Sequence, residues 1–163
     1  MNIKILFFIL VFLSNSLLAG KLKINVKNIQ EKVGSIHFAL YNDGEFFPEK
    51  KGKILGLVKD AEEIFQDGLL IEDLKESKYA VAIFHDENSN DEFDTFWSLP
   101  QEKYGFSNNA SVYFGPPSFE DASFFVKNDS VNITYSLIII PIETLFFDNI
   151  SDTATRKIDK RTF

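Results

Sequence analysis

The sequence contains no cysteine, so the chain can form neither a disulfide nor a thiol nucleophile. Its folded state must be stabilised by an apolar core, and a bound metal ion could add to that stability. Histidine is also scarce: His37 and His85 are the two in the chain, and neither lies in a recognisable hydrolase motif. Basic residues number 17 against 24 acidic ones. Because nucleic-acid binding needs clustered basic side chains, we expect no nucleic-acid partner.

Apolar residues, by contrast, are plentiful: they make up 45% of the 163 residues, and 18 residues are phenylalanine. This composition is sufficient for the core of one domain. The chain begins in the order typical of a secretory signal peptide, with Lys4, then an apolar run over residues 5–13, then a small or polar region over residues 14–20. The sequence therefore predicts export to the periplasm or the cell exterior.

We place the signal peptide at residues 1–19, with cleavage after Ala19 and a cut after Gly20 as the alternative. The mature chain would then carry no transmembrane segment. An uncleaved membrane anchor over residues 3–18 is the competing interpretation.

Alternating apolar and polar residues predict several β-strands in the mature chain. In "LKINVKN" and "SIHFALYN" the apolar residues recur at every second position, and we predict that these two segments form a hairpin. In "SKYAVAIFHD" both faces are apolar, which predicts a strand in the centre of a layered structure. The later segment "VNITYSLIII" predicts a strand that closes the domain.

The remaining segments complete an all-β pattern. Residues 43–53 are rich in turn formers and predict a loop, from which Phe46 and Phe47 fold back onto the edge of the sheet. Residues 54–74 predict two more short strands, and residues 98–126 a long aromatic connection with strand-like pieces at 112–114 and 124–126. No long helix is predicted. We therefore predict a single antiparallel β-sandwich of about seven strands.

This domain would span residues 20–140, followed by a C-terminal extension over residues 141–163. The extension either covers a sheet edge and then frays, or serves as a docking tail for a partner.

Three motifs occur in order along the chain: "YAVAIFHDENSNDEFD", "YGFSNNA" and "FGPPSFEDASF". Together with the strand ending "FALYN", they closely resemble an exported bacterial family known as domain of unknown function 2141. The resemblance covers about residues 22–137. It implies a small periplasmic or secreted β-sandwich of immunoglobulin-like or transthyretin-like type, and it implies no established reaction.

The loop in "FHDENSNDEFDTF" is the strongest candidate site. Its oxygen-bearing side chains occupy the first, third, fifth and ninth positions of a helical calcium loop, namely Asp86, Asn88, Asn90 and Asp94. Calcium takes six to eight such oxygens, so the loop predicts a weak calcium site. Asp and Asn also hydrogen-bond their own backbone in turns, so a plain turn without metal explains the same residues.

Two positions depart from the calcium-loop pattern. The sixth residue is Asp91 rather than glycine, and the twelfth is Trp97, so the usual bidentate glutamate is missing. A tight site would need a further carboxylate, for which the candidates are Glu102, Glu120 and Asp121.

These features favour an exported, non-enzymatic domain that binds an envelope protein, a glycan or a small ligand, and we expect no catalytic residues. One alternative is a secreted hydrolase that uses His85 and Asp86, with Ser107 as nucleophile. A second alternative is a carrier with an apolar cavity, which the many phenylalanines suggest. For "PPSFEDA" we predict a structural role, in which Ser118 and Asp121 cap a turn of helix and Phe119 is its apolar anchor.

Overall fold

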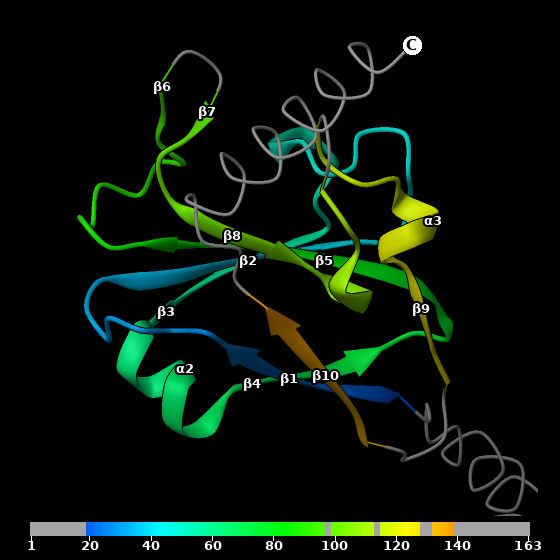
Figure 1. Cartoon of the computed structure of the whole chain (residues 1–163). Helices are drawn as coiled ribbons and strands as arrows, with labels where there is room; N and C mark the ends of the chain where they lie inside the picture. The colour runs from blue at the N-terminus through cyan, green and yellow to red at the C-terminus, as the bar shows by residue number, and fades with distance from the viewer. Residues whose placement is uncertain (1–18, 97–98, 113–114, 128–131, 139–163) are drawn as a thin grey trace, which may run out of the picture.

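The computed structural model describes residues 19–96, 99–112, 115–127 and 132–138 (Figure 1). The predicted signal peptide, apart from Ala19, and the predicted C-terminal extension lie outside the described residues. The fold is mostly β-strand, as predicted, and its strands form two main sheets. No helix among the described residues combines the length and the apolar character that a membrane crossing would need.

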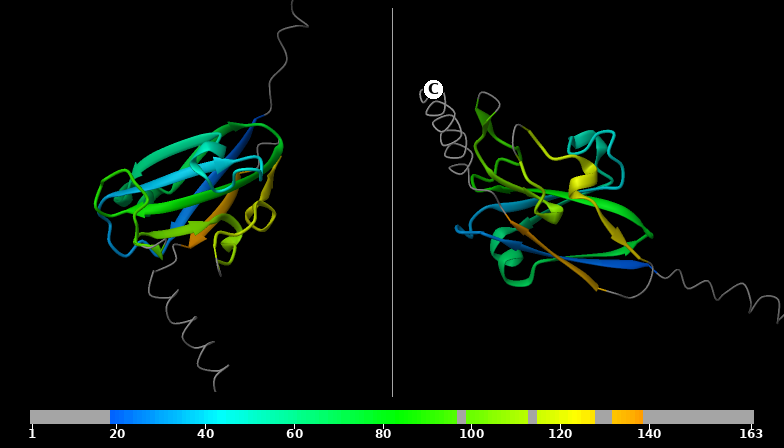
Figure 2. Two further views of the ribbon diagram at one scale, coloured as in Figure 1. Left: turned by 90° about the horizontal axis from the view of Figure 1, so that it is seen from above. Right: turned by 45° about the vertical axis from the view of Figure 1, so that its right-hand side comes forward.

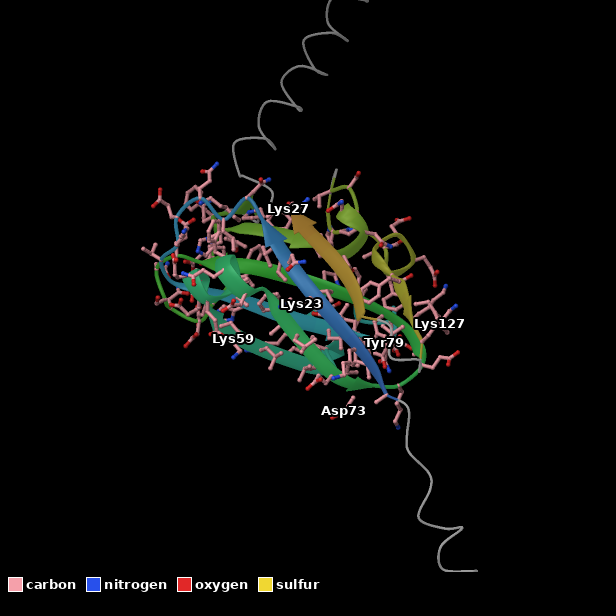
Figure 3. The ribbon with its side chains drawn as sticks, turned by 90° about the horizontal axis from the view of Figure 1, so that it is seen from below. Lys23, Lys27, Lys59, Asp73, Tyr79 and Lys127 are labelled. Atoms are coloured by element: carbon pink, nitrogen blue, oxygen red, sulfur yellow. The ribbon has the colours of Figure 1, made fainter. Side chains whose placement is uncertain are left out.

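The first sheet has three strands in the order β10 (Asn132–Ile138), β1 (Gly20–Lys27) and β4 (Leu69–Leu74). Strands β1 and β4 are antiparallel, whereas β1 and β10 are parallel. The parallel pair departs from the expected antiparallel arrangement. On β1 the apolar residues predicted to share a face are buried, and the other face carries Lys23 and Lys27 into solvent (Figure 3).

The second sheet has the order β3 (Leu55–Asp60), β2 (Ser35–Tyr41), β5 (Ser77–Asp86) and β8 (Lys103–Phe106). The short strand β9 (Phe124–Val126) pairs with the start of β5, on the edge that β8 occupies further along. Strand β5 is thus flanked on both sides, which confirms the central position predicted from its two apolar faces. All pairings in this sheet are antiparallel.

The predicted hairpin between the first two strands is wrong, because β1 and β2 belong to different sheets. Strand β2 pairs instead with β3 and β5. The error has a simple physical reason. Alternation identifies which face of a strand is buried but not which strand lies beside it, and the apolar faces of β1 and β2 meet the same core from opposite sides.

The two sheets lie face to face across this core (Figure 2). We call the face of the five-stranded sheet that points toward the core its inner face, and the opposite face its outer face. Along β5, alternate residues contribute Tyr79, Val81 and Ile83 to the inner face, and all three are buried. The residues between them, Ala80, Ala82 and Phe84, belong to a second apolar cluster on the outer face.

A short helix, α2 (Ala61–Asp67), joins β3 to β4 and was not predicted. The side chain of Asp60 accepts a hydrogen bond from the N–H of Glu63 at 3.0 Å and caps the helix, and Gly68 ends it with φ of 65°. Ala61 and Ile64 are buried. The two strands predicted on either side of the helix are present as β3 and β4.

Irregular segments cover the outer face of the five-stranded sheet. The loop that contains the 3-10 helix η1 (Lys50–Gly52) places Phe47 against Tyr41, with ring centroids 5.0 Å apart, which confirms the predicted folding back of this residue. The connection after β8 forms the 3-10 helix η2 (Ser107–Asn109) and the helix α3 (Phe119–Ala122). Of the strand-like pieces predicted in this connection, residues 124–126 form β9; Val112 lies outside any strand, and 113–114 lie outside the described residues.

The predicted cap of α3 is present. The hydroxyl of Ser118 accepts a hydrogen bond from the N–H of Asp121 at 3.2 Å and lies 2.7 Å from its carboxylate. Phe119 packs partly buried against the outer cluster, so the role predicted for it as an apolar anchor is also confirmed.

Candidate functional site

The predicted Asp/Asn loop begins at the last residue of β5 and leads into a small hairpin formed by β6 (Thr95–Phe96) and β7 (Leu99–Pro100). Strand alternation puts Asp86 on the outer face of the sheet, like Phe84, while His85 points to the inner side. Within the loop, Phe93 packs on Phe84 and on Tyr104 of β8, with ring centroids 5.3 and 5.9 Å apart. These aromatic contacts hold the loop against the outer face.

Asp86 is fully buried, and its carboxylate organises the turn. Its two oxygens accept hydrogen bonds from the N–H groups of Asn90 at 3.2 Å and Asp91 at 2.9 Å. Burial acts to raise the pKa of this carboxyl, but the N–H groups of Asp91, Asn90 and Ser89, together with His37, hold the pKa below its usual value. The backbone of the loop therefore stabilises the ionised form of Asp86 at a buried position.

The loop bends sharply without glycine. Ser89 and Asp91 have φ of 59° and 61°, in the left-handed region that favours glycine. Asp91 occupies the position where a calcium loop usually has glycine, and aspartate tolerates this conformation better than most residues. The tight turn that the site requires is thus present in spite of the departure from the pattern.

The side chains of three predicted ligand residues meet directly, and Asp86 joins them through the backbone N–H of Asn90. The side-chain amides of Asn88 and Asn90 donate to one carboxylate oxygen of Asp94, at 2.8 and 3.0 Å. Their side-chain oxygens accept from backbone N–H groups of the loop, those of Asn90 and Glu92. A half-turn of each amide about its last torsion exchanges oxygen and nitrogen, so the same side chains could present oxygens to a cation.

Glu102 joins this group from outside the loop, directly before β8. One of its oxygens accepts a hydrogen bond from the N–H of Asp94 at 3.2 Å, and the residue is only 7% exposed. Its other oxygen, Oε1, is buried and has no hydrogen-bond partner among the described residues. Burial raises the pKa of Glu102 to about 7, opposed by the N–H of Asp94 and reinforced by the carboxylates of Asp86 and Asp94.

Of the three further carboxylates considered from the sequence, the structure brings only Glu102 to the loop. Glu120 and Asp121 belong to α3, where Glu120 pairs with Lys78 at 2.7 Å and Asp121 takes part in the helix cap.

Sequence reasoning missed His37, which lies beside the loop on the outer face of β2. Its Nε2 is 3.5 Å from Asp86 Oδ2 and 3.6 Å from Asp91 Oδ1, and its ring stacks on Phe84 with centroids 4.3 Å apart. The ligand atoms of the three residues lie within 4.8 Å of one another, which defines a second position for a cation that also uses Asp86. The pairing of β2 with β5 creates this contact, and no local motif signals it.

His85 and Ser107, the residues considered for a hydrolase, are fully buried and bound to backbone groups. The Nε2 of His85 is 2.8 Å from the carbonyl oxygen of Val33. The hydroxyl of Ser107 accepts from the N–H of Val81 at 2.8 Å and donates to the carbonyl of Ala122 at 2.6 Å. Because Val81 precedes His85 by four residues on β5, Ser107 bonds to the strand about 13 Å from His85.

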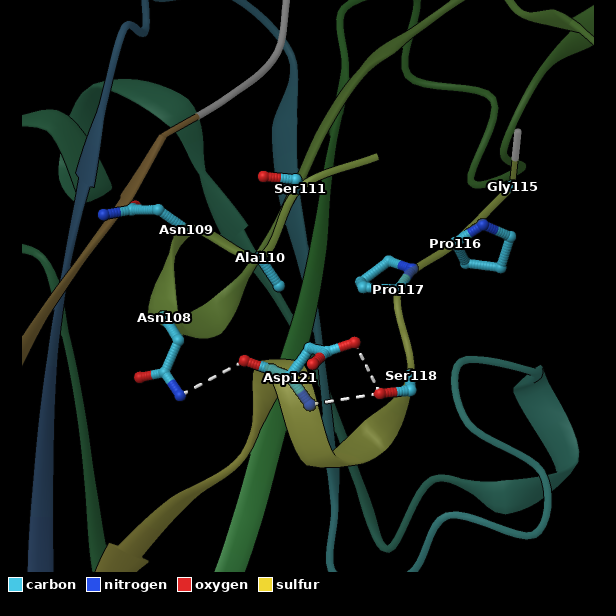
Figure 4. A pocket seen from close by; sticks show the side chains of 9 residues that line it. All are labelled: Asn108, Asn109, Ala110, Ser111, Gly115, Pro116, Pro117, Ser118 and Asp121. Atoms are coloured by element: carbon cyan, nitrogen blue, oxygen red, sulfur yellow. Dashed lines mark hydrogen bonds between the residues drawn. The ribbon is translucent and has the colours of Figure 1, made fainter. Parts of the chain in front are cut away.

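Two hollows elsewhere bear on ligand binding. A cleft of about 630 Å³ lies between η2 and α3, and the described residues that line it are 108–111, 115–118 and Asp121 (Figure 4). There Ser118 is bonded to Asp121, and the amide of Asn108 donates to the carbonyl of Asp121 at 3.4 Å. The gap between the two sheets has no room for a water-sized sphere among its described lining residues: Ile24, Phe38, Ala39, Leu40, Leu55, Leu57, Ile71 and Val81.

The fold and the site thus define a mostly β protein that carries one polar loop at the end of its central strand. Residues 24–134 match the model of a family described as "Uncharacterized protein conserved in bacteria", domain of unknown function 2141. The chain belongs to this family, which confirms the resemblance seen in its motifs. Comparison with curated proteins and with solved structures found no match.

Proposed function

We propose that the protein is an exported, non-enzymatic β-sandwich domain of immunoglobulin-like or transthyretin-like type. Its loop end would contact an envelope protein, a glycan or a small ligand, and calcium bound by the loop of residues 86–94 would keep that end ordered. The observation that carries this proposal is that the side chains of Asn88 and Asn90 converge on Asp94, while Asp86 binds the backbone N–H of Asn90 in the same loop. The two sheets that share one core support the sandwich part of the proposal.

The chemistry of the loop favours calcium over softer metals. The converging groups are carboxylates and amides, which are hard oxygen donors, and the first, third, fifth and ninth positions match those of a calcium loop. Asp86 and Asp94 place two carboxylates in one short loop, and among the described residues no lysine or arginine forms an ion pair with either. A divalent cation would offset this charge.

A hydrolase is not favoured, because its residues are occupied elsewhere. Ser107 uses its hydroxyl to bridge the backbones of Val81 and Ala122. A nucleophile needs a base within hydrogen-bond reach and access to substrate, and Ser107 has neither. The carrier is not favoured either, because the described side chains close the gap between the sheets.

Thermal unfolding in calcium and in chelator tests the proposal. A site of this kind in an exported protein has a Kd on the order of 0.1 to 1 mM. If Kd is about 0.1 mM, 10 mM calcium stabilises the folded state by about 2.7 kcal/mol and raises Tm by several degrees. An unchanged Tm between 10 mM calcium and excess chelator would rule out the calcium site.

Two variants locate the effect. Asp94→Asn keeps the shape of the side chain but removes its charge, so we expect the calcium-dependent shift to shrink strongly. Asp73→Asn is the matched control: Asp73 precedes β5 while the loop follows it, and asparagine tolerates the φ of 60° found there. We expect the control to retain the full shift.

A further inference from the structure

The loop of residues 86–94 does not contain enough ligands for calcium by itself. A calcium loop normally supplies a bidentate glutamate at its twelfth position, and Trp97 stands there. Asp86, Asn88, Asn90 and Asp94 offer four side chains, whereas calcium takes six to eight oxygens. If the loop holds calcium as proposed above, at least one more strong ligand must come from another segment.

The buried carboxylate of Glu102 is in the right place. Its Oε2 accepts the N–H of Asp94, so the carboxyl group lies against the ninth residue of the loop. A backbone hydrogen bond also holds the segment before Glu102 against the loop: the N–H of Gln101 donates to the carbonyl of Asp94 at 2.8 Å. The β6–β7 hairpin thus returns the chain to the loop and delivers Glu102 to it.

Glu102 also has one oxygen that receives no hydrogen bond from a backbone or side-chain N–H of the described residues. Its Oε1 is buried without a hydrogen-bond partner among the described residues, and the residue is 93% buried, given its 7% exposure. A buried acceptor left without a partner is costly, and one facing two other carboxylates is more so. No ion pair within the described chain involves Glu102; the adjacent Lys103 pairs with Glu87 instead.

We infer that Glu102 is the calcium ligand that replaces the missing glutamate of the loop, so that the ion ties the end of β5 to the start of β8. This inference rests on the proposed calcium site. It makes the ion a clamp between two strands on the outer face of the sheet. Two other arrangements compete with it: a proton shared between Glu102 and Asp86, and a metal bound by Asp86 together with His37 and Asp91.

The test is a calcium titration of the full mature chain and of Glu102→Gln, followed by Tm and by isothermal titration calorimetry. Glutamine keeps the size of the side chain and its acceptor for Asp94, but removes the charge. We expect the Kd for calcium to rise at least about tenfold, since the number of charged ligands sets the affinity of such sites. In chelator we expect the Tm of Glu102→Gln to equal or exceed that of the parent, because an unpartnered buried carboxylate is gone.

The order of Tm should therefore reverse between chelator and saturating calcium. Glu120→Gln is the matched control, an exposed acid of α3 that should change neither Kd nor this order. Glu102→Asp provides a second variant that keeps the charge on a shorter side chain, and we expect a smaller loss of affinity than with glutamine.

Each other outcome overturns the inference in a distinct way. Equal calcium affinity in the parent and Glu102→Gln would remove Glu102 from the site while leaving the proposed function intact. A parent that shows no calcium response would remove both. An equal loss of Tm in chelator and in calcium would mean that Glu102 only supports the backbone of Asp94. A response to zinc but not calcium, abolished by His37→Gln, would assign the ion to His37, Asp86 and Asp91 instead.

Discussion

The two faces of the five-stranded sheet are buried in different ways. The inner face is covered by another sheet, and its central contacts are apolar, among them Ile36, Phe38 and Val81. The outer face is covered by loops and short helices, and fully buried polar side chains lie there among aromatic rings, notably Asp86 and Ser107. The same strand, β5, thus supports two unlike environments.

The difference follows from where backbone groups find their hydrogen bonds. Strands in a sheet pair with one another, so the inner core can consist mainly of apolar side chains. His85 at its end is an exception, and it bonds to the carbonyl of Val33 in a loop. Loops lack such pairing, and each buried N–H or C=O in them needs a side-chain partner. Asp86 serves the N–H groups of its own loop, and Ser107 serves Val81 and Ala122. The loops over the outer face require buried polar groups, and these same polar groups allow a binding site to form there.

The largest effect should come from breaking the inner face. Val81→Asp would bury a carboxylate among apolar side chains and should destabilise the fold by about 3 to 5 kcal/mol. Calcium should stabilise the variant and the parent by the same amount and so leave the difference between them unchanged, because the loop and the inner core are separate. Urea unfolding with and without calcium measures both quantities.

Val58→Asp is the control for this variant, since Val58 is 52% exposed on the edge strand β3. Its effect should stay within about 0.5 kcal/mol. If Val81→Asp unfolds at the same urea concentration as the parent, the description of the inner core is wrong.

An intermediate effect should come from the buried hydroxyl of the outer face. Ser107→Ala leaves the N–H of Val81 and the C=O of Ala122 without their partner, which should cost about 2 to 3 kcal/mol. Urea unfolding of Ser111→Ala, an exposed serine of the same connection, serves as control and should match the parent. A loss no larger than in the control would show that burial on the outer face does not depend on this hydroxyl.

The sequence predicted the faces of the strands well and their neighbours poorly. Alternation identified the buried residues of β1, β2 and β5, since a period of two depends only on local geometry. Pairing depends on contacts between distant segments, which is why β1 and β2 were wrongly joined and the parallel pairing of β1 with β10 was not foreseen. The helix α2 did have a local signal, an aspartate cap with a glutamate three residues later and a terminal glycine, but it is short.

The candidate site divides in the same manner. Asp86, Asn88, Asn90 and Asp94 could be grouped from the sequence because one short loop carries them. Glu102 could be named only as one of three acids, and His37 could not be named, since strand pairing and the β6–β7 hairpin bring them to the loop. The packing of the core determines which distant residues reach the loop, and the local sequence pattern does not specify that packing.

The smallest effect should come from the cap of α3, where solvent can replace what the side chain provides. Ser118 is exposed, and its hydroxyl accepts the N–H of Asp121. Ser118→Ala should therefore cost about 1 kcal/mol, the usual value for a helix cap, and less than Ser107→Ala, because water can reach the N–H that is left free. Ser118→Thr keeps the hydroxyl and should lie close to the parent. Urea unfolding of Ser118→Ala, Ser118→Thr and Ser107→Ala side by side measures these differences. If Ser118→Ala cost as much as Ser107→Ala, solvent access would not distinguish the two hydroxyls. Exposed helix caps would then stabilise the outer face as much as its buried polar groups do.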